Sequence, residues 1–229
     1  MKIAMWSGPR NLSTAMMYAF GSRPDFTAWD EPFYAAYLKA TGIDHPMRQE
    51  VLARDETDAN KVSQSICEKT GNIFLKLMSF HMCEGFPFEW ADQCVHAHLI
   101  RHPARVVASY IAKREKPTLR DIGFEQQAEL FGRFPGPVVD SADVRENPEK
   151  ALNSLCSALG IAFDPMMLNW PKGPKPFDGI WAPHWYNAVH QSTGFAGAEG
   201  PLPELDGEAA ALAEQAMPFY EMLRAHAIT

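Results

Sequence analysis

The sequence predicts an α/β fold in which a parallel β-sheet of about five strands is flanked by helices. Two observations support this prediction. Short apolar runs alternate along the chain with longer helix-compatible segments, the pattern of a parallel sheet covered on both faces. In addition, residues 2–20 and 95–114 each contain an apolar strand, a tight loop and a helix, the unit from which such sheets are built.

The expected strands and helices follow the apolar runs and the residues at their ends. Asn147 before Pro148 favours a helix start, because asparagine caps the first amides and proline fits the first turn. Gly160 favours the end of that helix. Strands are expected at Lys2–Trp6, Phe26–Trp29, Asn72–Leu77, Val95–Ile100 and Pro137–Asp140. Helices are expected at Leu12–Phe20, Phe33–Ala40, Asp58–Lys69, Pro103–Arg114, Phe124–Phe134, Pro148–Leu159 and Glu208–Ala225.

The length of the chain favours a single domain over residues 1–229, which can enclose a substantial core. Hydrophobic residues make up 46% of the chain and charged residues 21%, values that exclude wholesale disorder. Residues 170–203 are rich in proline, glycine and aromatic residues. This composition favours an ordered loop or lid, with a short helix around residues 184–190, over a linker.

Charge, apolar pattern and cysteine spacing bear on partners and compartment. A net charge of −7 without a basic block argues against nucleic acid or an anionic membrane as the partner. No apolar run approaches the ~20 residues that span a bilayer, and no signal-peptide core begins the sequence, so we expect a cytoplasmic protein. The 4 cysteines and 8 histidines lack CxxC, zinc-ligand and HExxH spacing, which predicts reduced thiols and no metal. The oligomeric state stays open.

Two segments have the pattern of anion-binding junctions. One runs from an apolar strand through Ser7-Gly8-Pro9-Arg10-Asn11-Leu12-Ser13-Thr14 into a helix, and the other from a strand that ends at Arg101 into a helix that begins at Pro103. Backbone N–H groups and the helix dipole favour an anion at such a junction. Two junctions in one sheet predict a ligand with two separated phosphates. The first loop lacks the GK[ST] of a Walker A loop, which disfavours ordinary ATP or GTP hydrolysis.

Both junctions resemble motifs of the sulfotransferases that depend on PAPS (3′-phosphoadenosine 5′-phosphosulfate). Residues 9–14, Pro-Arg-Asn-Leu-Ser-Thr, resemble the family's P-[KR]-S-G-[ST]-[ST] loop, and Arg101, Pro103, Val106 and Ser109 fit R-x-P-x-x-V-x-x-S. Residues 140–163 resemble the late segment of bacterial members. The resemblance covers most of residues 1–170 and implies a P-loop nucleotide-binding, sulfotransferase-like fold.

The resemblance also implies a donor site with PAPS as co-substrate, PAP as product and no metal. Residues Arg10, Asn11, Leu12, Ser13 and Thr14 would cradle the 5′-phosphosulfate, and Arg101 and Ser109 would hold the 3′-phosphate. Arg10 would stabilise the charge that develops on the leaving phosphate. The chain departs from the pattern at Leu12, where the family has a glycine and leucine does not readily take positive φ, and at Ala15, where an aromatic residue often stacks on adenine.

A general base has to accept the proton of the acceptor, and two residues are candidates. Glu31, in Asp30-Glu31-Pro32-Phe33, resembles a glutamate-proline element that some bacterial sulfotransferases place at the acceptor. His81 follows the third strand, where the animal cytosolic branch has a catalytic histidine. A helix-start acid and a core histidine remain the structural alternatives for these two residues. Lys76 either joins the donor site or lies at a strand edge with its charge in water.

We therefore expect a transferase that moves the sulfuryl group of PAPS to a hydroxyl or amine of a small-molecule acceptor, by in-line displacement without metal. The acidic chain and its aromatic-rich late loop favour a neutral or cationic, partly apolar acceptor. Two alternatives remain open at this point, a small-molecule kinase with a degenerate P-loop and a non-catalytic nucleotide-binding protein.

Overall fold

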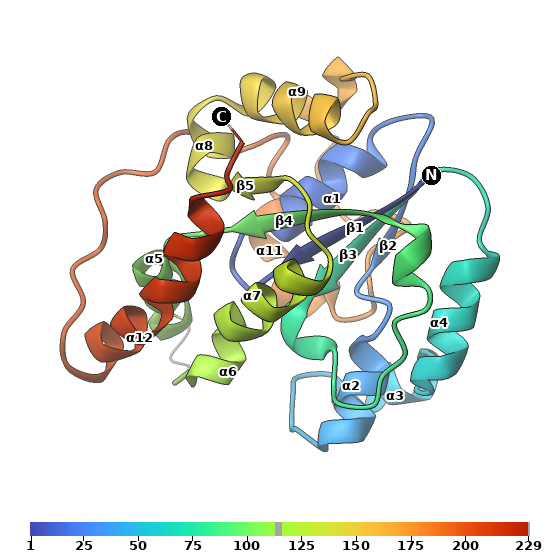
Figure 1. Ribbon diagram of the computed structural model, residues 1–229, viewed down its shortest axis with the longest axis horizontal. Helices are drawn as coiled ribbons and strands as arrows, with labels where there is room; N and C mark the ends of the chain where they lie inside the picture. Colours follow the sequence, from blue (N-terminus) through green and yellow to red (C-terminus); the bar gives the residue numbers. More distant parts are fainter. Residues whose placement is uncertain (113–115, 229) are drawn as a thin grey trace.

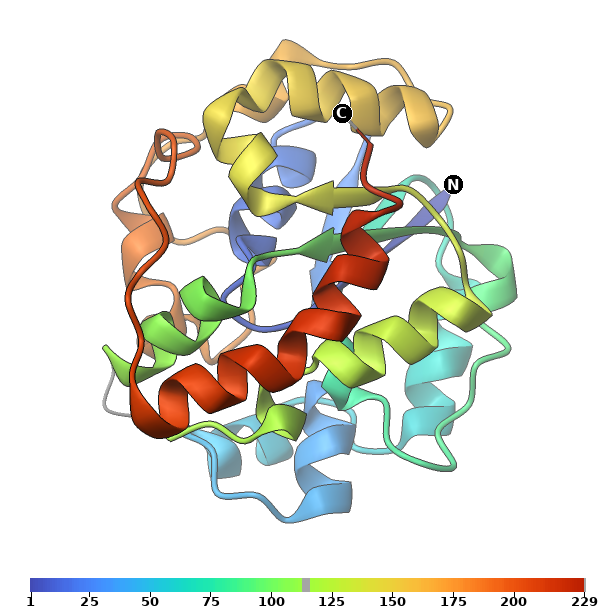
Figure 2. The same ribbon diagram turned by 60° about the vertical axis from the view of Figure 1, so that its left-hand side comes forward.

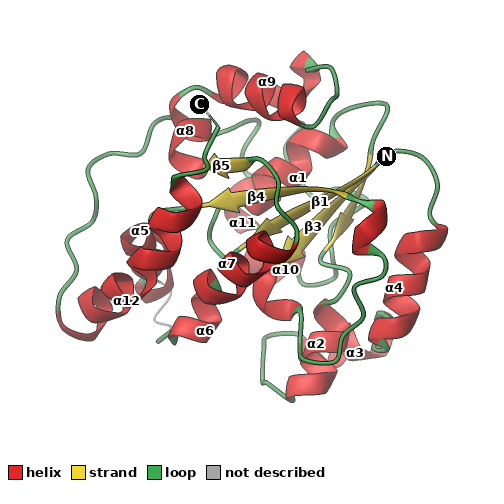
Figure 3. Ribbon diagram, viewed as in Figure 1, coloured by secondary structure: helices red, strands yellow, loops and turns green. Residues whose placement is uncertain are grey.

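A computed structural model describes residues 1–112 and 116–228 of the chain. Five strands form one parallel sheet in the order β2-β3-β1-β4-β5, with helices on both faces (Figure 1 and Figure 3). The predicted α/β class with a parallel sheet is therefore confirmed. Each predicted strand is present, with its ends shifted by at most one residue. The strands are β1 (Lys2–Ser7), β2 (Thr27–Asp30), β3 (Ile73–Met78), β4 (Val95–Ile100) and β5 (Val138–Asp140).

The helices also follow the sequence, with additions where helical segments are short. The predicted helices are α1 (Ser13–Gly21), α2 (Tyr34–Thr41), α4 (Ala59–Glu68), α5 (Pro103–Ile111), α7 (Phe124–Arg133), α9 (Pro148–Ala158) and α12 (Gly207–Arg224). The short helix expected around residues 184–190 is two helices, α10 (Ala182–Trp185) and α11 (Asn187–His190). The structure adds α3 (Arg48–Arg54), α6 (Leu119–Ile122) and α8 (Ser141–Glu146). Residues 113 and 114 of the predicted 103–114 helix lie outside the described residues.

Two apolar cores lie on the two faces of the sheet, because alternate side chains of a strand point to opposite faces. Ile3 and Met5 of β1 belong to a core shared with α1, α2 and α9. Ala4 and Trp6 belong to a second core, shared with α4 and α7. Helix α1 is buried on nearly all sides. After Ser13 and Thr14 its sequence is accordingly hydrophobic on every side instead of amphipathic.

The order of the strands fixes where a ligand can bind. The chain passes from β1 to β2 and β3 on one side of the sheet and then crosses to β4 and β5 on the other side. Strand β1 pairs with both β3 and β4, so the loops after β1 and β4 leave the same edge in opposite directions. Such a switch point leaves a crevice at the carboxyl ends of the strands. Both predicted anion-binding junctions border it.

Side chains from neighbouring elements hold the loop that follows β1. The amide of Gln127 in α7 donates to the carbonyl oxygens of Trp6 (3.2 Å) and Leu99 (3.0 Å), and its oxygen accepts from the N–H of Gly8 (3.1 Å). The Asn11 amide donates to the Leu99 carbonyl oxygen at 3.2 Å. The loop is therefore fastened to the sheet at both of its ends.

This anchoring accounts for an unusual backbone conformation in the loop. Leu12 has φ of 71° and Arg10 has φ of 62°, both in the left-handed region. The expectation that a leucine would avoid this conformation is wrong here. The left-handed conformation costs a residue with a Cβ on the order of 1–2 kcal/mol. The hydrogen bonds on either side of the loop oppose that cost and hold the backbone in place.

The late aromatic-rich segment, residues 170–203, is anchored on α1. The Tyr18 ring makes edge contacts with Trp170 (5.8 Å between centroids) and Phe177 (5.6 Å). The Tyr18 hydroxyl donates to the Asp178 carboxylate at 2.8 Å. An isolated bridge between Asn169 and Gly194 closes the segment on itself. The following residues run along the outside of the molecule to the start of α12 (Figure 2).

Candidate active site

A cavity of about 700 Å³ opens at the carboxyl edge of the sheet. Segments that follow β1, β2, β3 and β4 contribute to its wall, together with residues of the late segment. The structure brings all site residues predicted from the sequence to this one cavity. They are Arg10, Asn11, Leu12, Ser13, Thr14, Glu31, His81, Arg101 and Ser109.

The loop after β1 presents unsatisfied backbone donors at one end of the cavity. Helix α1 begins after Leu12 without a side-chain cap and without an acidic residue in its first turn. The amides of residues 10–14 donate no hydrogen bond to any other residue that the structure describes. The positive end of the α1 dipole is therefore not neutralised by the protein there. This end of the cavity is suited to an anion.

Arg10 adds a charge beside these amides. Its guanidinium carbon lies 5.6 Å from the ring centroid of Tyr110 and 5.7 Å from that of Trp185. The aromatic faces stabilise the cation and orient it. Its Nη2 atom is buried and has no hydrogen-bond partner among the described residues. A buried donor of this kind costs free energy unless a ligand accepts from it.

The second junction lies directly beside the first. Arg101, at the tip of β4, donates from Nη1 to the carbonyl oxygen of Arg10 at 2.8 Å. Ser109, two turns into α5, lines the same cavity. The two arginines therefore converge from the tips of neighbouring strands, as the two-phosphate prediction requires.

Arg101 also belongs to an ion-pair cluster that the sequence did not reveal. The Glu199 carboxylate pairs with Arg101, Arg105 and Arg145. Arg101 directly follows β4, Arg105 lies on α5 and Arg145 lies on α8, whereas Glu199 lies in the segment before α12. No local pattern marks such a contact, because its members lie far apart in the sequence.

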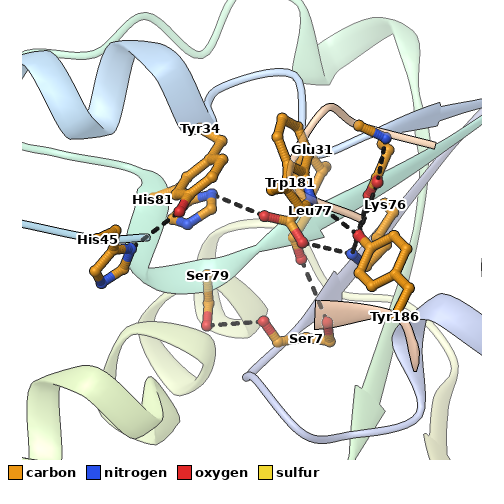
Figure 4. Close-up of polar contacts among 12 residues, drawn as sticks. Ser7, Glu31, Tyr34, His45, Lys76, Leu77, Ser79, His81, Trp181 and Tyr186 are labelled. Atoms are coloured by element: carbon orange, nitrogen blue, oxygen red, sulfur yellow. Dashed lines mark hydrogen bonds and ion pairs between the residues drawn. The ribbon is translucent and has the colours of Figure 1, made fainter. Parts of the chain in front are cut away.

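A second buried cluster joins the ends of β2 and β3 to the late segment (Figure 4). The Lys76 ammonium donates to Asp30 Oδ1 at 2.9 Å, to Glu31 Oε1, and to the Tyr186 hydroxyl at 2.6 Å. The Tyr186 hydroxyl lies 2.7 Å from Asp30 Oδ2 and accepts from the Trp181 indole at 3.0 Å. The Lys76 side chain is 1% exposed, so the interpretation of Lys76 as a strand-edge residue is wrong.

The two carboxylates of this cluster differ in their partners. Asp30 is enclosed by the Lys76 ammonium, the Tyr186 hydroxyl and the amide of Gly179, which donates to Asp30 Oδ2 at 3.0 Å. Glu31 has φ of 42°, in the left-handed region, and its side chain lines the cavity. Asp30 is therefore placed to hold the cluster together, whereas Glu31 is placed to meet a ligand.

Burial and charge determine the protonation of the cluster. Burial raises the pKa of Glu31, the nearby Lys76 charge opposes this shift, and the Asp30 charge adds to it. Burial disfavours the charged form of Lys76, but Asp30 and Glu31 outweigh that effect and raise its pKa. Burial and the two carboxylates raise the pKa of Tyr186 well above its usual range, so its hydroxyl keeps its proton.

His81 follows β3, in the 3₁₀-helix η1 (Ser79–His81), and packs among aromatic rings. Its imidazole stacks on Tyr34 and Tyr37 at centroid distances of 4.9 Å and 4.7 Å. His81 Nδ1 lies 3.8 Å from Glu31 Oε2, beyond hydrogen-bonding distance. Burial lowers the pKa of His81 well below its ordinary value, so the ring is neutral at neutral pH.

Comparison with known proteins identifies the family. A sequence model of the sulfotransferase domain matches residues 1–227, so the chain belongs to the sulfotransferase domain family. The resemblance deduced from the two motifs is thereby confirmed. Two curated relatives from Arabidopsis thaliana, the branched-chain-amino-acid aminotransferase-like proteins 1 and 2, are each 37% identical over 98% of this chain. The chain spans only 42% and 41% of the length of these two relatives.

Solved structures share the fold over most of the chain. The sulfotransferase domain from the curacin biosynthetic pathway has a TM-score of 0.56 and 15% identity, covering 94% of this chain and 96% of that chain. A sulfotransferase from Alicyclobacillus acidocaldarius has a TM-score of 0.56 and 9% identity, covering 99% and 96%. At these identities the likeness establishes a common fold.

The described part of the chain contains neither a cluster of metal-binding side chains nor a membrane-spanning helix. Across residues 1–112 and 116–228, no group of three or more histidine, cysteine, aspartate or glutamate side chains could hold a metal ion. No helix in the described part of the chain is both long and apolar enough to cross a bilayer.

Proposed function

We propose that the protein is a sulfotransferase that transfers the sulfuryl group of PAPS to a hydroxyl or amine of a small-molecule acceptor and releases PAP. The observation that supports this proposal is the single cavity that joins the loop of residues 8–14 to Arg101 and Ser109. The residues present fit this donor. Unsatisfied amides and the buried Arg10 Nη2 atom suit one anionic group, and Arg101 suits a second anionic group a short distance away.

In this proposal the amides of residues 10–14, with the Ser13 and Thr14 hydroxyls, bind the phosphosulfate, and Arg101 and Ser109 bind the 3′-phosphate. The bond between sulfur and the bridging oxygen breaks, and its electron pair remains on the phosphate. A new bond forms between sulfur and the acceptor oxygen or nitrogen. Arg10 stabilises the charge on the leaving phosphate as a fixed cation, since a guanidinium does not give up its proton.

Glu31 is the base that we propose for the acceptor proton. It lines the cavity, and its burial raises its pKa, which makes the carboxylate a better proton acceptor than an ordinary glutamate. His81 is neutral but has a strongly lowered pKa, which makes it a weak base. We therefore assign His81 to packing the wall beside Glu31, and Lys76 to keeping Glu31 ionised and oriented.

The acceptor side of the cavity is aromatic. Tyr34, Trp181 and Trp185 line it, and a neutral or cationic, partly apolar small molecule fits such a wall. We propose that residues 170–203 form the lid of this side within one domain of residues 1–229. A cytoplasmic location is in keeping with the cysteines, which are all free thiols.

Calorimetric titration with PAP and with ADP tests the donor assignment, because ADP lacks the 3′-phosphate. We expect PAP to bind tighter than ADP, and Arg101→Ala to remove that preference. Arg54→Met, at an exposed position on α3, is the matched control and should leave both affinities unchanged. Equal binding of PAP and ADP that is indifferent to Arg101→Ala would refute the assignment. Magnesium-dependent turnover of ATP would instead favour the kinase alternative.

A further inference from the structure

Glu199 occupies an enclosed position in the segment between α11 and α12. Its side chain is only 2% exposed. Its carboxylate forms an ion pair with Arg101, another with Arg105 Nε at 2.8 Å, and a third with Arg145 Nη1 at 3.0 Å. Figure 2 shows this segment running along the outside of the molecule past α5. The Glu199 carboxylate is therefore buried among three guanidinium groups, although its segment lies on the outside of the molecule.

The three arginines gather around Glu199 at the carboxyl edge of the sheet. Arg101 follows β4, Arg105 lies on the first turn of α5, and Arg145 lies on α8, which follows β5 directly. Three positive charges face a single negative charge, so one carboxylate leaves the group with excess positive charge. In addition, Arg101 Nε is buried without a hydrogen-bond partner in the described part of the chain. Compared with a carboxylate, a phosphate monoester carries one more negative charge and one more terminal oxygen, so it can accept from more of the guanidinium groups.

We propose that Arg105 and Arg145 bind the 3′-phosphate of the donor together with Arg101, and that the Glu199 carboxylate occupies this subsite until the donor displaces it. The inference rests on the function proposed above and deepens it by naming what completes the 3′-phosphate site. Glu199 and the phosphate compete for the same donors, because Arg101 Nη2, Arg105 Nε and Arg145 Nη1 are all paired with the Glu199 carboxylate.

Displacing Glu199 also releases the backbone of its segment. Arg145 Nε donates to the Gly197 carbonyl oxygen at 2.8 Å, and Arg105 donates to the Gly200 carbonyl oxygen. When both arginines turn to a phosphate, these contacts with residues 197–200 are lost as well. The apparent affinity of the natural protein for the donor is therefore the intrinsic affinity multiplied by the fraction of molecules whose subsite is free of the segment.

The experiment compares PAP and ADP binding by calorimetry in the natural protein, in Glu199→Gln and in Glu204→Gln. Glu204 is exposed in the same segment and loses the same charge, so it is the matched control. We expect Glu199→Gln to bind PAP about tenfold tighter, with ADP affinity unchanged, because only PAP has a 3′-phosphate. Glu204→Gln should leave both affinities unchanged. Glu199→Asp, which keeps the charge on a shorter side chain, should give an intermediate gain and serves if Glu199→Gln does not fold.

A second substitution tests whether Arg145 binds the 3′-phosphate. In the Glu199→Gln background, where the carboxylate no longer competes, Arg145→Met should weaken PAP binding about tenfold and spare ADP binding. Unchanged or weaker PAP binding by Glu199→Gln would overturn this inference, while PAP binding by the natural protein would leave the proposed function standing. Binding of neither nucleotide by the natural protein or by Glu199→Gln would overturn both.

Discussion

The loop after β1 and the buried cluster around Lys76 meet in the same cavity but are built in opposite ways. The loop is one continuous stretch whose amides, at residues 10–14, have no partner among the described residues. The cluster joins three separate parts of the chain, residues 30–31, Lys76 and Tyr186, and the Lys76 ammonium donates to Asp30, Glu31 and Tyr186. Backbone donors that lack a protein partner can bind a ligand, whereas a network whose hydrogen bonds are all made holds its side chains in one arrangement.

Stability and function are therefore expected to depend differently on the two regions. Substitutions in the cluster should lower both, because its charges are buried and depend on one another. Substitutions in the loop should lower activity and leave stability nearly unchanged, because the ligand is the missing partner.

Lys76→Met removes the cation from between two buried carboxylates. We expect a loss of about 3–5 kcal/mol in the free energy of unfolding, since a buried charge is left without its partner. Urea unfolding measures this loss. Lys61→Met, on the exposed face of α4 where Lys61 lies 3.9 Å from Glu56, is the control and should cost no more than about 1 kcal/mol. Similar losses in the two variants would mean that the cluster does not depend on Lys76.

Glu31→Gln removes the proposed base and keeps its shape. We expect kcat to fall by about 10²–10⁴-fold. In the natural protein kcat/KM should rise with pH through the raised pKa of Glu31, since the carboxylate is the active form, and the variant should lose this rise. His81→Gln should leave the rise in place. If the rise of kcat/KM with pH persists in Glu31→Gln and disappears in His81→Gln, the base is His81 and not Glu31.

Arg10→Met removes the cation beside the loop. We expect kcat to fall by about 10²–10³-fold, the usual cost of losing one fixed group that stabilises a developing charge. The melting temperature should stay near that of the natural protein, because one nitrogen of Arg10 already lacks a partner among the described residues. A large loss of stability with little loss of kcat would place Arg10 in a structural role instead.

Tyr186→Phe removes one hydroxyl from the cluster and leaves its charges in place. Removing the hydroxyl leaves Asp30 with one donor fewer, at an expected cost of about 1–3 kcal/mol in the free energy of unfolding. Tyr220→Phe is the matched control, because the Tyr220 hydroxyl donates to the Asp140 carboxylate at 2.7 Å outside the cavity. Both variants should lose stability, but only Tyr186→Phe should also lower kcat. Equal kcat values would separate the cluster from catalysis.

The sheet and the donor end of the site could be predicted because their signals are local. Each strand is a short apolar run between turn residues, and each junction lies within one stretch of about 20 residues. The strand order then brought Arg10 and Arg101 to neighbouring strand tips. The positive φ of Leu12 could not be predicted from the loop alone, because it depends on hydrogen bonds of Asn11 and Gln127, and Gln127 lies on a distant helix.

The remaining parts of the site depend on contacts over long sequence distances. Lys76 meets Tyr186 across 110 positions, and Arg101 meets Glu199 across 98. Nothing in the residues around Glu199 distinguishes it from the exposed Glu204 of the same segment. Short helices such as α6 were missed because a single turn gives too little periodicity to detect.

A crystal structure of the protein with PAP bound would show whether the two strand tips hold the two ends of one nucleotide. We expect the 5′-phosphate on the amides of residues 10–14, beside Arg10, and the 3′-phosphate on Arg101 with Glu199 displaced. PAP bound with its 3′-phosphate away from Arg101, or outside the cavity altogether, would contradict this expectation.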